Sequence, residues 1–113
     1  MKRDEDYLRE LLTEFESSSD FIVLSSLTLG ASLEEKKRYY HIELLCDAGL
    51  MLPVGETSYR LTSQGHDFLE AVRSESRWSK IKHRAGSVTL PILYDVSVAL
   101  LKEEVRNRLG GEW

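Results

Sequence analysis

The sequence predicts a mainly α-helical α+β fold with one small β-hairpin. Three observations favour this fold class. Apolar residues recur at helical spacing in several segments, a capping-box pattern opens one of them, and two short β-prone runs flank a turn that contains Pro and Gly. The 113 residues, of which 42% are hydrophobic, suffice for one modest core. We therefore expect a single domain over residues 1–113.

The first expected element is a helix over residues 4–17. Acids fill its first turn, where the helix dipole favours them, and its apolar side chains form one stripe: Tyr7, Leu8, Leu11, Leu12 and Phe15. The serine-rich cluster at residues 17–20 ends this helix. The apolar run Phe21–Leu24 is too short for a helix and predicts a short strand.

A second helix is expected between Gly30 and Gly49. Ser32 as N-cap, with Glu35 three residues on, forms a capping box. Residues 25–30, between the strand and this helix, leave two alternatives: a very short helix, or an abbreviated motif without one. The predicted inner face of the second helix consists of Leu33, Lys37, Tyr40, His41, Leu44, Leu45 and Ala48.

The second half of the chain predicts a hairpin and then two helices. Residues 50–61 form the hairpin, with its turn at Pro53–Thr57. Thr62 caps a helix whose apolar pattern runs on to Arg84, and Gly65 is tolerated in it at a cost of about 1 kcal/mol. Ser87 or Thr89 caps the last helix, which accepts Pro91 in its first turn and stops at Gly110.

The order helix, strand, helix, hairpin and helices is that of a winged-helix domain. We expect a core over residues 1–72, in which the hairpin at 50–61 is the wing. Residues 73–113 form a C-terminal helical extension.

Two motifs carry a family resemblance, Tyr40–Leu50 and Leu61–Arg73. Together with the opening Met1–Asp6 and the segment Trp78–Lys82, they resemble the domain of unknown function 2513 family of bacteria and their phages. The resemblance implies a winged-helix-like fold and a place in phage or mobile-element genomes, and it implies no established activity. The short hairpin loop Pro53–Thr57 departs from the family's longer loops, which argues against a wing that reaches a minor groove.

Charge is distributed unevenly along the chain. The net charge is −4, with six Lys or Arg against eleven acids in residues 1–50 and nine against eight in residues 51–113. Residues 73–84 hold five cations against Glu75 alone. Because DNA-binding domains are usually basic, the overall charge opposes DNA, and any anionic partner is expected at residues 73–84.

Membrane, secretory, metal and catalytic roles are not expected. The sequence has neither a run of about 20 apolar residues nor a signal-peptide pattern, so we expect a cytoplasmic location. His41 and Cys46 would lie about 140° apart on a helix, which is unsuitable for one metal. The adjacent carboxylates do not face each other, and no catalytic motif is present, so we expect no enzyme and no cofactor.

Two hypotheses of function from different classes remain. In the first, a DNA-binding regulator places Lys36, Arg38 and Tyr39 in the major groove and Arg60 on the wing, while four cations hold the backbone: Arg77, Lys80, Lys82 and Arg84. In the second, the acidic N-terminal half, residues 1–50, binds a basic host or defence protein. Each candidate surface also has a purely structural alternative. Lys37, Tyr40 and His41 then line the inner face of the second helix, and residues 73–84 form a solvated basic face anchored by Trp78.

A homodimer is also considered, because winged-helix regulators normally pair on two half-sites. Ile42, Cys46 and the surface of the last helix are the candidate contacts.

Overall fold

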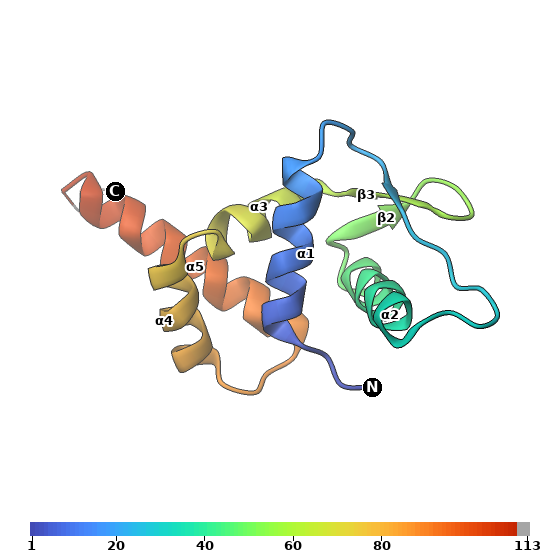
Figure 1. The fold of residues 1–113 in the computed structure, drawn as a ribbon. Coiled ribbons are helices and arrows are strands. Elements are labelled where there is room, and N and C mark those ends of the chain that lie inside the picture. The colour runs from blue at the N-terminus through green and yellow to red at the C-terminus, as the bar shows by residue number, and fades with distance from the viewer. Residues whose placement is uncertain (111–113) are drawn as a thin grey trace. The chain divides into compact units, whose positions relative to one another are not determined.

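The structure is a computed structural model that describes residues 1–110 (Figure 1). The described chain is mainly helical with a small antiparallel sheet, which confirms the predicted α+β class. Its elements are α1 (Glu5–Ser17), β1 (Val23–Leu24), α2 (Leu33–Asp47), β2 (Met51–Pro53), β3 (Ser58–Leu61), α3 (Ser63–Val72), α4 (Glu75–Ala85) and α5 (Leu90–Arg108).

The chain forms two compact units, one over Met1–His66 and a second that begins at Asp67. The boundary falls inside α3, between His66 and Asp67. Unit 1 holds α1, α2, the three strands and the start of α3. Unit 2 holds the rest of α3 with α4 and α5.

The sheet of unit 1 has the strand order β1-β3-β2, with both pairs antiparallel. The hairpin strands pair as predicted, and β1 adds a third strand by placing Val23 opposite Tyr59. One face of the sheet is buried through Val23, Met51, Tyr59 and Leu61. Further buried side chains of unit 1 come from the two helices: Leu8, Leu11, Leu12 and Phe15 on α1, and His41, Ile42 and Leu45 on α2.

The connection from α1 to α2 contains less regular structure than a complete helix-turn-helix. The Asp20 carboxylate accepts the amide of Ile22 at 3.1 Å, and this local turn holds the chain out of the sheet until Val23. The predicted strand Phe21–Leu24 is therefore only two residues long. Residues 25–32 form no helix and follow an open path to α2 (Figure 1). Of the two alternatives for this segment, the abbreviated one is observed.

The prediction of one helix from Thr62 to Arg84 is wrong, because the structure has two helices there, α3 and α4. The helix breaks at Arg73–Ser74, because Ser74 is an N-cap whose hydroxyl accepts the amide of Arg77 at 3.2 Å. This start of α4 competes with continuation of α3. α4 ends at Gly86, whose φ of +61° favours glycine, and α5 begins after Thr89 with Pro91 in its first turn.

Apolar side chains of unit 2 are buried at helical spacing on each of its helices. Trp78 and Ile81 are buried on α4 and Leu93 and Leu100 on α5, so Trp78 has the anchoring role that the sequence indicated. The Phe68 and Tyr94 rings stack with centroids 6.0 Å apart. Among residues 1–110, no helix combines the length and apolar character needed to cross a membrane.

Candidate partner-contact surfaces

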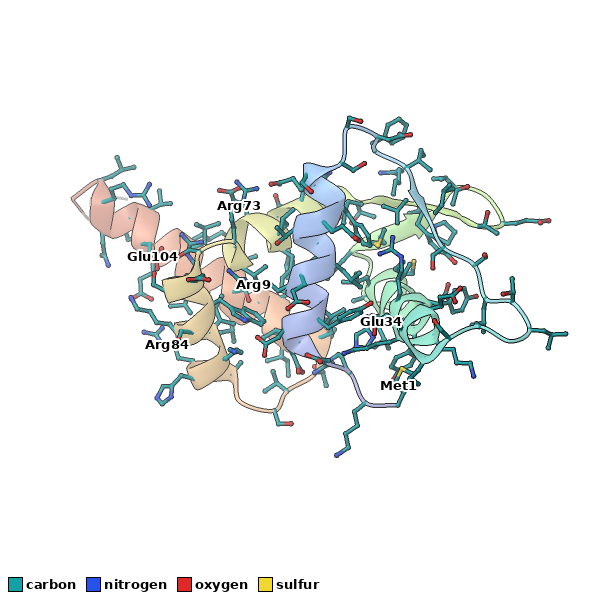
Figure 2. The ribbon with its side chains drawn as sticks, viewed as in Figure 1. Met1, Arg9, Glu34, Arg73, Arg84 and Glu104 are labelled. Atoms are coloured by element: carbon teal, nitrogen blue, oxygen red, sulfur yellow. The ribbon has the colours of Figure 1, made fainter. Side chains whose placement is uncertain are left out.

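The first turn of α2 is rich in acids. Lys36 is exposed and has no ion-pair partner within residues 1–110. Glu34, labelled in Figure 2, and Glu35 precede it. The Ser32 hydroxyl accepts the Glu35 amide at 3.1 Å and the Glu35 carboxylate accepts the Ser32 amide at 3.1 Å, which confirms the capping box. The start of this helix therefore offers a phosphate more repulsion than attraction.

Arg38, assigned to the major groove in the DNA hypothesis, already has a partner inside unit 1. Its Nη1 donates to Glu14 Oε2 at 2.7 Å, and its guanidinium lies 5.3 Å from the centre of the Phe15 ring. Tyr39 is half-buried. Of the two α2 cations in that hypothesis, only Lys36 remains open to a ligand.

His41 joins the two helices of unit 1 as a buried structural residue. Its Nε2 accepts the Asp4 amide at 2.9 Å, so the neutral ring carries its hydrogen on Nδ1, which donates to the Lys37 carbonyl at 2.7 Å. Lys37 Nζ lies 3.3 Å from Asp4 Oδ2. The amide of Tyr7 holds the pKa of Asp4 below its usual value, with a further contribution from Lys37. These contacts agree with the inward-facing alternative for Lys37 and His41.

Two residues of α2 lie on the opposite side from that predicted. Leu33, expected on the inner face, is 76% exposed, whereas Ile42 is completely buried. Ile42 is therefore unavailable for the homodimer contact proposed from the sequence. The start and end of α2 were predicted correctly from the sequence. Which stripe of the helix meets the core depends on how α1 and the sheet pack against it.

Cys46 is half-buried, and burial raises its pKa to about 11, with further contributions from the carboxylates of Glu43 and Asp47. Because the thiolate is the reactive form, we expect iodoacetamide to alkylate the native protein at pH 8 at least about tenfold more slowly than the urea-unfolded chain. The native rate should rise as the pH approaches 11. Mass spectrometry of timed samples measures both rates, with Cys46→Ser as the unlabelled control. Equal rates in the two states would contradict the burial of this thiol.

An acidic hollow lies between α1 and the start of α2. It measures about 320 Å³ and is lined by Tyr7, Leu11, Arg38 and four glutamates, which are Glu10, Glu14, Glu34 and Glu35. Burial raises the pKa of Tyr7, and the Glu34 carboxylate raises it further. From residue 10 to residue 35 the chain carries six acids and no Lys or Arg. This side of unit 1 is therefore repulsive to anions.

Exposed apolar side chains lie on the outer face of the sheet, which also carries Ser58 and Arg60, and in the loop after β1; together they are called the apolar patch. We define it as Leu24, Leu27, Leu29, Leu52 and Val54. Leu24 lies opposite Ser58 in the ladder, and the Val54 amide donates to the Ser58 carbonyl at 2.9 Å, so Leu24 and Val54 flank Ser58 on one face. Leu24 is 68% exposed, and Leu29 is fully exposed.

No motif in the sequence points to this patch as a functional surface. Its one local sign is the leucine-rich stretch from Leu24 to Leu29, which has no helical or strand periodicity that would bury it. The contribution of Leu52 and Val54 follows only from the sheet register. Exposed apolar clusters on otherwise polar surfaces often mark interaction sites.

Arg60 lies on β3 opposite Leu52 and is half-buried. Its Nη1 donates to the Leu61 carbonyl at 3.2 Å. It also lines a hollow of about 410 Å³ at the end of α1, together with Phe15, Ser63 and the exposed His66. Arg60 therefore lies on β3, the second strand of the predicted hairpin, and the role of this hairpin as a wing stays a prediction.

Arg77 is removed from the predicted set of partner contacts. Its side chain is 10% exposed, and Nε donates to Glu104 at 2.8 Å while Nη1 donates to the carbonyls of Glu70 and Ala71. These bonds close the end of α3 and tie α4 to α5, and Figure 2 labels Glu104 on α5. Arg77 is a structural residue because its donors are already used inside unit 2.

The other three predicted cations of α4 are exposed. Lys80 and Arg84 line a shallow hollow with Ser76, Ser79 and His83. Arg84 also lies 3.6 Å from Glu103, and Lys82 Nζ lies 5.6 Å from the centre of the Trp78 ring. The structure thus places Lys80, Lys82 and Arg84 on one helix of unit 2. Within residues 1–110, no group of three His, Cys, Asp or Glu side chains is arranged to hold a metal ion.

Comparison with known proteins places the chain in a family. The sequence profile of the family described as Hypothetical protein (DUF2513) matches residues 2–90. The chain belongs to the DUF2513 family. Unit 1 from Lys2 onward, α3 and α4 lie within the part that matches the DUF2513 profile, whereas α5 from Pro91 onward lies beyond it.

A relative from Haemophilus influenzae (strain ATCC 51907 / DSM 11121 / KW20 / Rd) carries the name "Uncharacterized protein". It is 30% identical to this DUF2513 chain over 105 residues, which cover 84% of the chain and 87% of the relative. No solved structure matches. A phage or mobile-element origin of the chain stays a prediction.

Proposed function

We propose that this DUF2513 chain is a non-catalytic protein-binding module that contacts its partner through the apolar patch of unit 1. The observation that carries the proposal is the exposure of Leu24, Leu52 and Val54 on the outer face of the sheet, together with the exposed Leu27 and Leu29 in the loop that follows β1. Leaving such side chains in water is unfavourable by about 25 cal/mol per Å² of apolar area. A protein partner that covers the patch recovers this free energy.

Charge favours a protein over a nucleic acid or a lipid surface as the occupant. The charged residues of the segment from residue 10 to residue 35, which contributes Leu24, Leu27 and Leu29 to the patch, are six acids, whereas Arg60 is the cation opposite Leu52. Phosphate-rich DNA and anionic lipid headgroups are both repelled by such a segment. Of the α2 cations assigned to DNA, only Lys36 remains available, because Arg38 is paired with Glu14.

Site-specific photo-crosslinking in a bacterium that carries the gene tests this proposal. A photoreactive residue at Leu29 or Leu52 should give a discrete protein adduct, whereas the same residue at the exposed Thr13 of α1 should not. The adduct should disappear when Leu24 is also changed to Asp. Adducts of equal yield from Thr13, or none from the patch, would exclude this surface as the contact.

DNA binding through α4 is the second candidate, and it is supported by the exposure of Lys80, Lys82 and Arg84 on that helix. We expect any such binding to weaken steeply between about 50 and 200 mM salt, because cations that contact phosphates displace counterions. Lys80→Glu with Lys82→Glu should abolish it, and Lys36→Glu on α2 should leave it within about twofold. Anisotropy titration of a labelled random duplex measures all three proteins. No binding at about 50 mM salt rules this candidate out.

A further inference from the structure

A hollow of unit 1 lies where the end of α1 meets the sheet and the start of α3 (Figure 1). Its volume of about 410 Å³ is within the range of sites that hold small molecules. Three of the side chains that line it, those of Phe15, Val23 and Leu61, are buried and apolar. A fourth, Phe21, is 75% exposed, which is unfavourable for so large an apolar side chain. The hollow therefore has both the room and the apolar surface for the ring of a small ligand.

The two walls of this hollow come from different segments and differ in charge. One wall is the end of α1 and the turn after it, with the exposed acids Glu16 and Asp20. The other wall is the end of β3 and the start of α3, with the half-buried Arg60 and the exposed His66. The lining thus offers a complement to a negative and to a positive group of one ligand.

Arg60 and Asp20 line the same hollow without forming an ion pair. Within residues 1–110, Arg60 donates to the Leu61 carbonyl at 3.2 Å and has no carboxylate partner. The Asp20 carboxylate accepts the Ile22 amide through Oδ1 at 3.1 Å and pairs with no cation of the described chain. Opposite charges that line one hollow and stay apart leave space for a ligand that bridges them.

We propose that this hollow binds an aromatic α-amino acid. The Arg60 guanidinium suits the ligand's carboxylate, because it offers paired N–H donors to two oxygens. Asp20, on the opposite wall, suits the ammonium group through the carboxylate oxygen that the Ile22 amide leaves unused. Phe15 and Phe21 suit the ring, because aromatic rings attract each other beyond the burial of their surface. None of the residues that line the hollow belongs to the apolar patch, so the site is independent of the proposed function.

The mixed charge of the lining selects a zwitterion over a simple anion or a simple amine. A ligand with only a carboxylate would share the hollow with the acids Glu16 and Asp20, and a ligand with only an amine would share it with Arg60. A phosphate, with more negative charge than a carboxylate, is repelled more strongly by the two acids. We therefore expect the carboxylate, the ammonium group and the ring all to contribute to binding.

Four ligands titrated into the full chain test which groups are required. L-Phenylalanine should bind with a Kd of about 1 mM, as expected for a ligand of its size. Phenylacetate lacks the ammonium group, phenethylamine lacks the carboxylate and L-alanine lacks the ring, so each should bind at least about tenfold more weakly. NMR shifts of backbone amides measure the affinities. Those of Phe21 and His66 should move, whereas the Trp78 indole of unit 2 should not.

Two conservative variants test the assignment of the charges. Arg60→Gln keeps N–H donors for the Leu61 carbonyl, and Asp20→Asn keeps the acceptor of the Ile22 amide, but each removes one charge. Both should retain the circular dichroism spectrum of the wild type and bind L-phenylalanine at least about tenfold more weakly. Arg84→Gln, at an exposed position of α4, is the matched control and should bind like the wild type.

Binding of L-phenylalanine that needs all three of its groups and both charges of the hollow supports the site. The proposal is overturned if L-phenylalanine at about 10 mM leaves the amides of the hollow unmoved. It is also overturned if any of the three incomplete ligands binds as tightly, or if either charge variant binds unchanged. Photo-crosslinking from the apolar patch would be unaffected by any of these results.

Discussion

Replacing Gly65 with alanine is expected to destabilise unit 1 by about 3 kcal/mol, within the upper range for overpacking. A Cβ at this position would lie 2.0 Å from the Leu50 carbonyl oxygen and 3.2 Å from Leu61 Cδ2. The first atom belongs to the main chain and accepts the Thr62 amide at 3.1 Å, so it cannot move without breaking the end of the hairpin. The gain of about 1 kcal/mol in helix propensity offsets only part of this cost.

Urea unfolding followed by circular dichroism measures the effect of Gly65→Ala. Gly55→Ala is the matched control, because its added methyl group meets only the side chain of Ser58, with the hydroxyl at 3.1 Å, in an exposed turn. We expect the control to stay within about 0.5 kcal/mol of the wild type. A stability loss below about 1 kcal/mol for Gly65→Ala would show that α3 does not approach the Leu50 carbonyl this closely. Gly65 would then be merely tolerated in the helix at a cost of about 1 kcal/mol, as the sequence suggested, and would not be required by packing.

Replacing Arg77 with methionine is expected to destabilise unit 2 by about 2–4 kcal/mol. The substitution leaves the Glu104 carboxylate without its partner and removes the donor to the last carbonyls of α3, those of Glu70 and Ala71. Loss of one member of a buried ion pair costs about 3–5 kcal/mol. The loss expected here, about 2–4 kcal/mol, is smaller than that general range, because Glu104 is 30% exposed and water screens its charge.

Arg84→Met is the control for this experiment, since the Arg84 guanidinium is exposed and lies 3.6 Å from Glu103. It should change stability by less than about 1 kcal/mol. Arg77→Lys should recover only part of the loss, because one ammonium group does not reproduce the planar fork that reaches three acceptors. Similar thermal midpoints for Arg77→Met and Arg84→Met would contradict a structural role for Arg77 and return it to the set of candidate contacts.

Local chemistry accounts for what the sequence predicted correctly. The capping box at Ser32 and Glu35 and the side-chain cap of α3 by Thr62 each involve residues three positions apart. The hairpin depends in the same way on a short turn between β2 and β3. Such contacts form whatever surrounds them, so composition and spacing suffice. The break before α4 was missed because the apolar spacing from Phe68 to Ile81 continues through it, and the N-cap at Ser74 outweighs that pattern.

The candidate surfaces depended on contacts between distant residues. Arg38 and Arg77 were open cations in the sequence, yet they pair with Glu14 and Glu104, which are 24 and 27 residues away. Burial of Ile42 and exposure of Leu33 depend on the stripe of α2 that meets the core. The apolar patch exists because β1 joins the hairpin and its register puts Leu24 on the same face as Val54.

The sequence by itself determined most of the helix bounds, though not the break between α3 and α4, and it determined the hairpin and the uneven charge, because short-range hydrogen bonds and composition set them. Only the tertiary structure decided which charges remain open and which apolar side chains remain uncovered. The physical reason is that both depend on which groups packing brings within a few ångströms. A cation such as Arg77 loses its freedom to bind a partner only when the fold supplies its carboxylate.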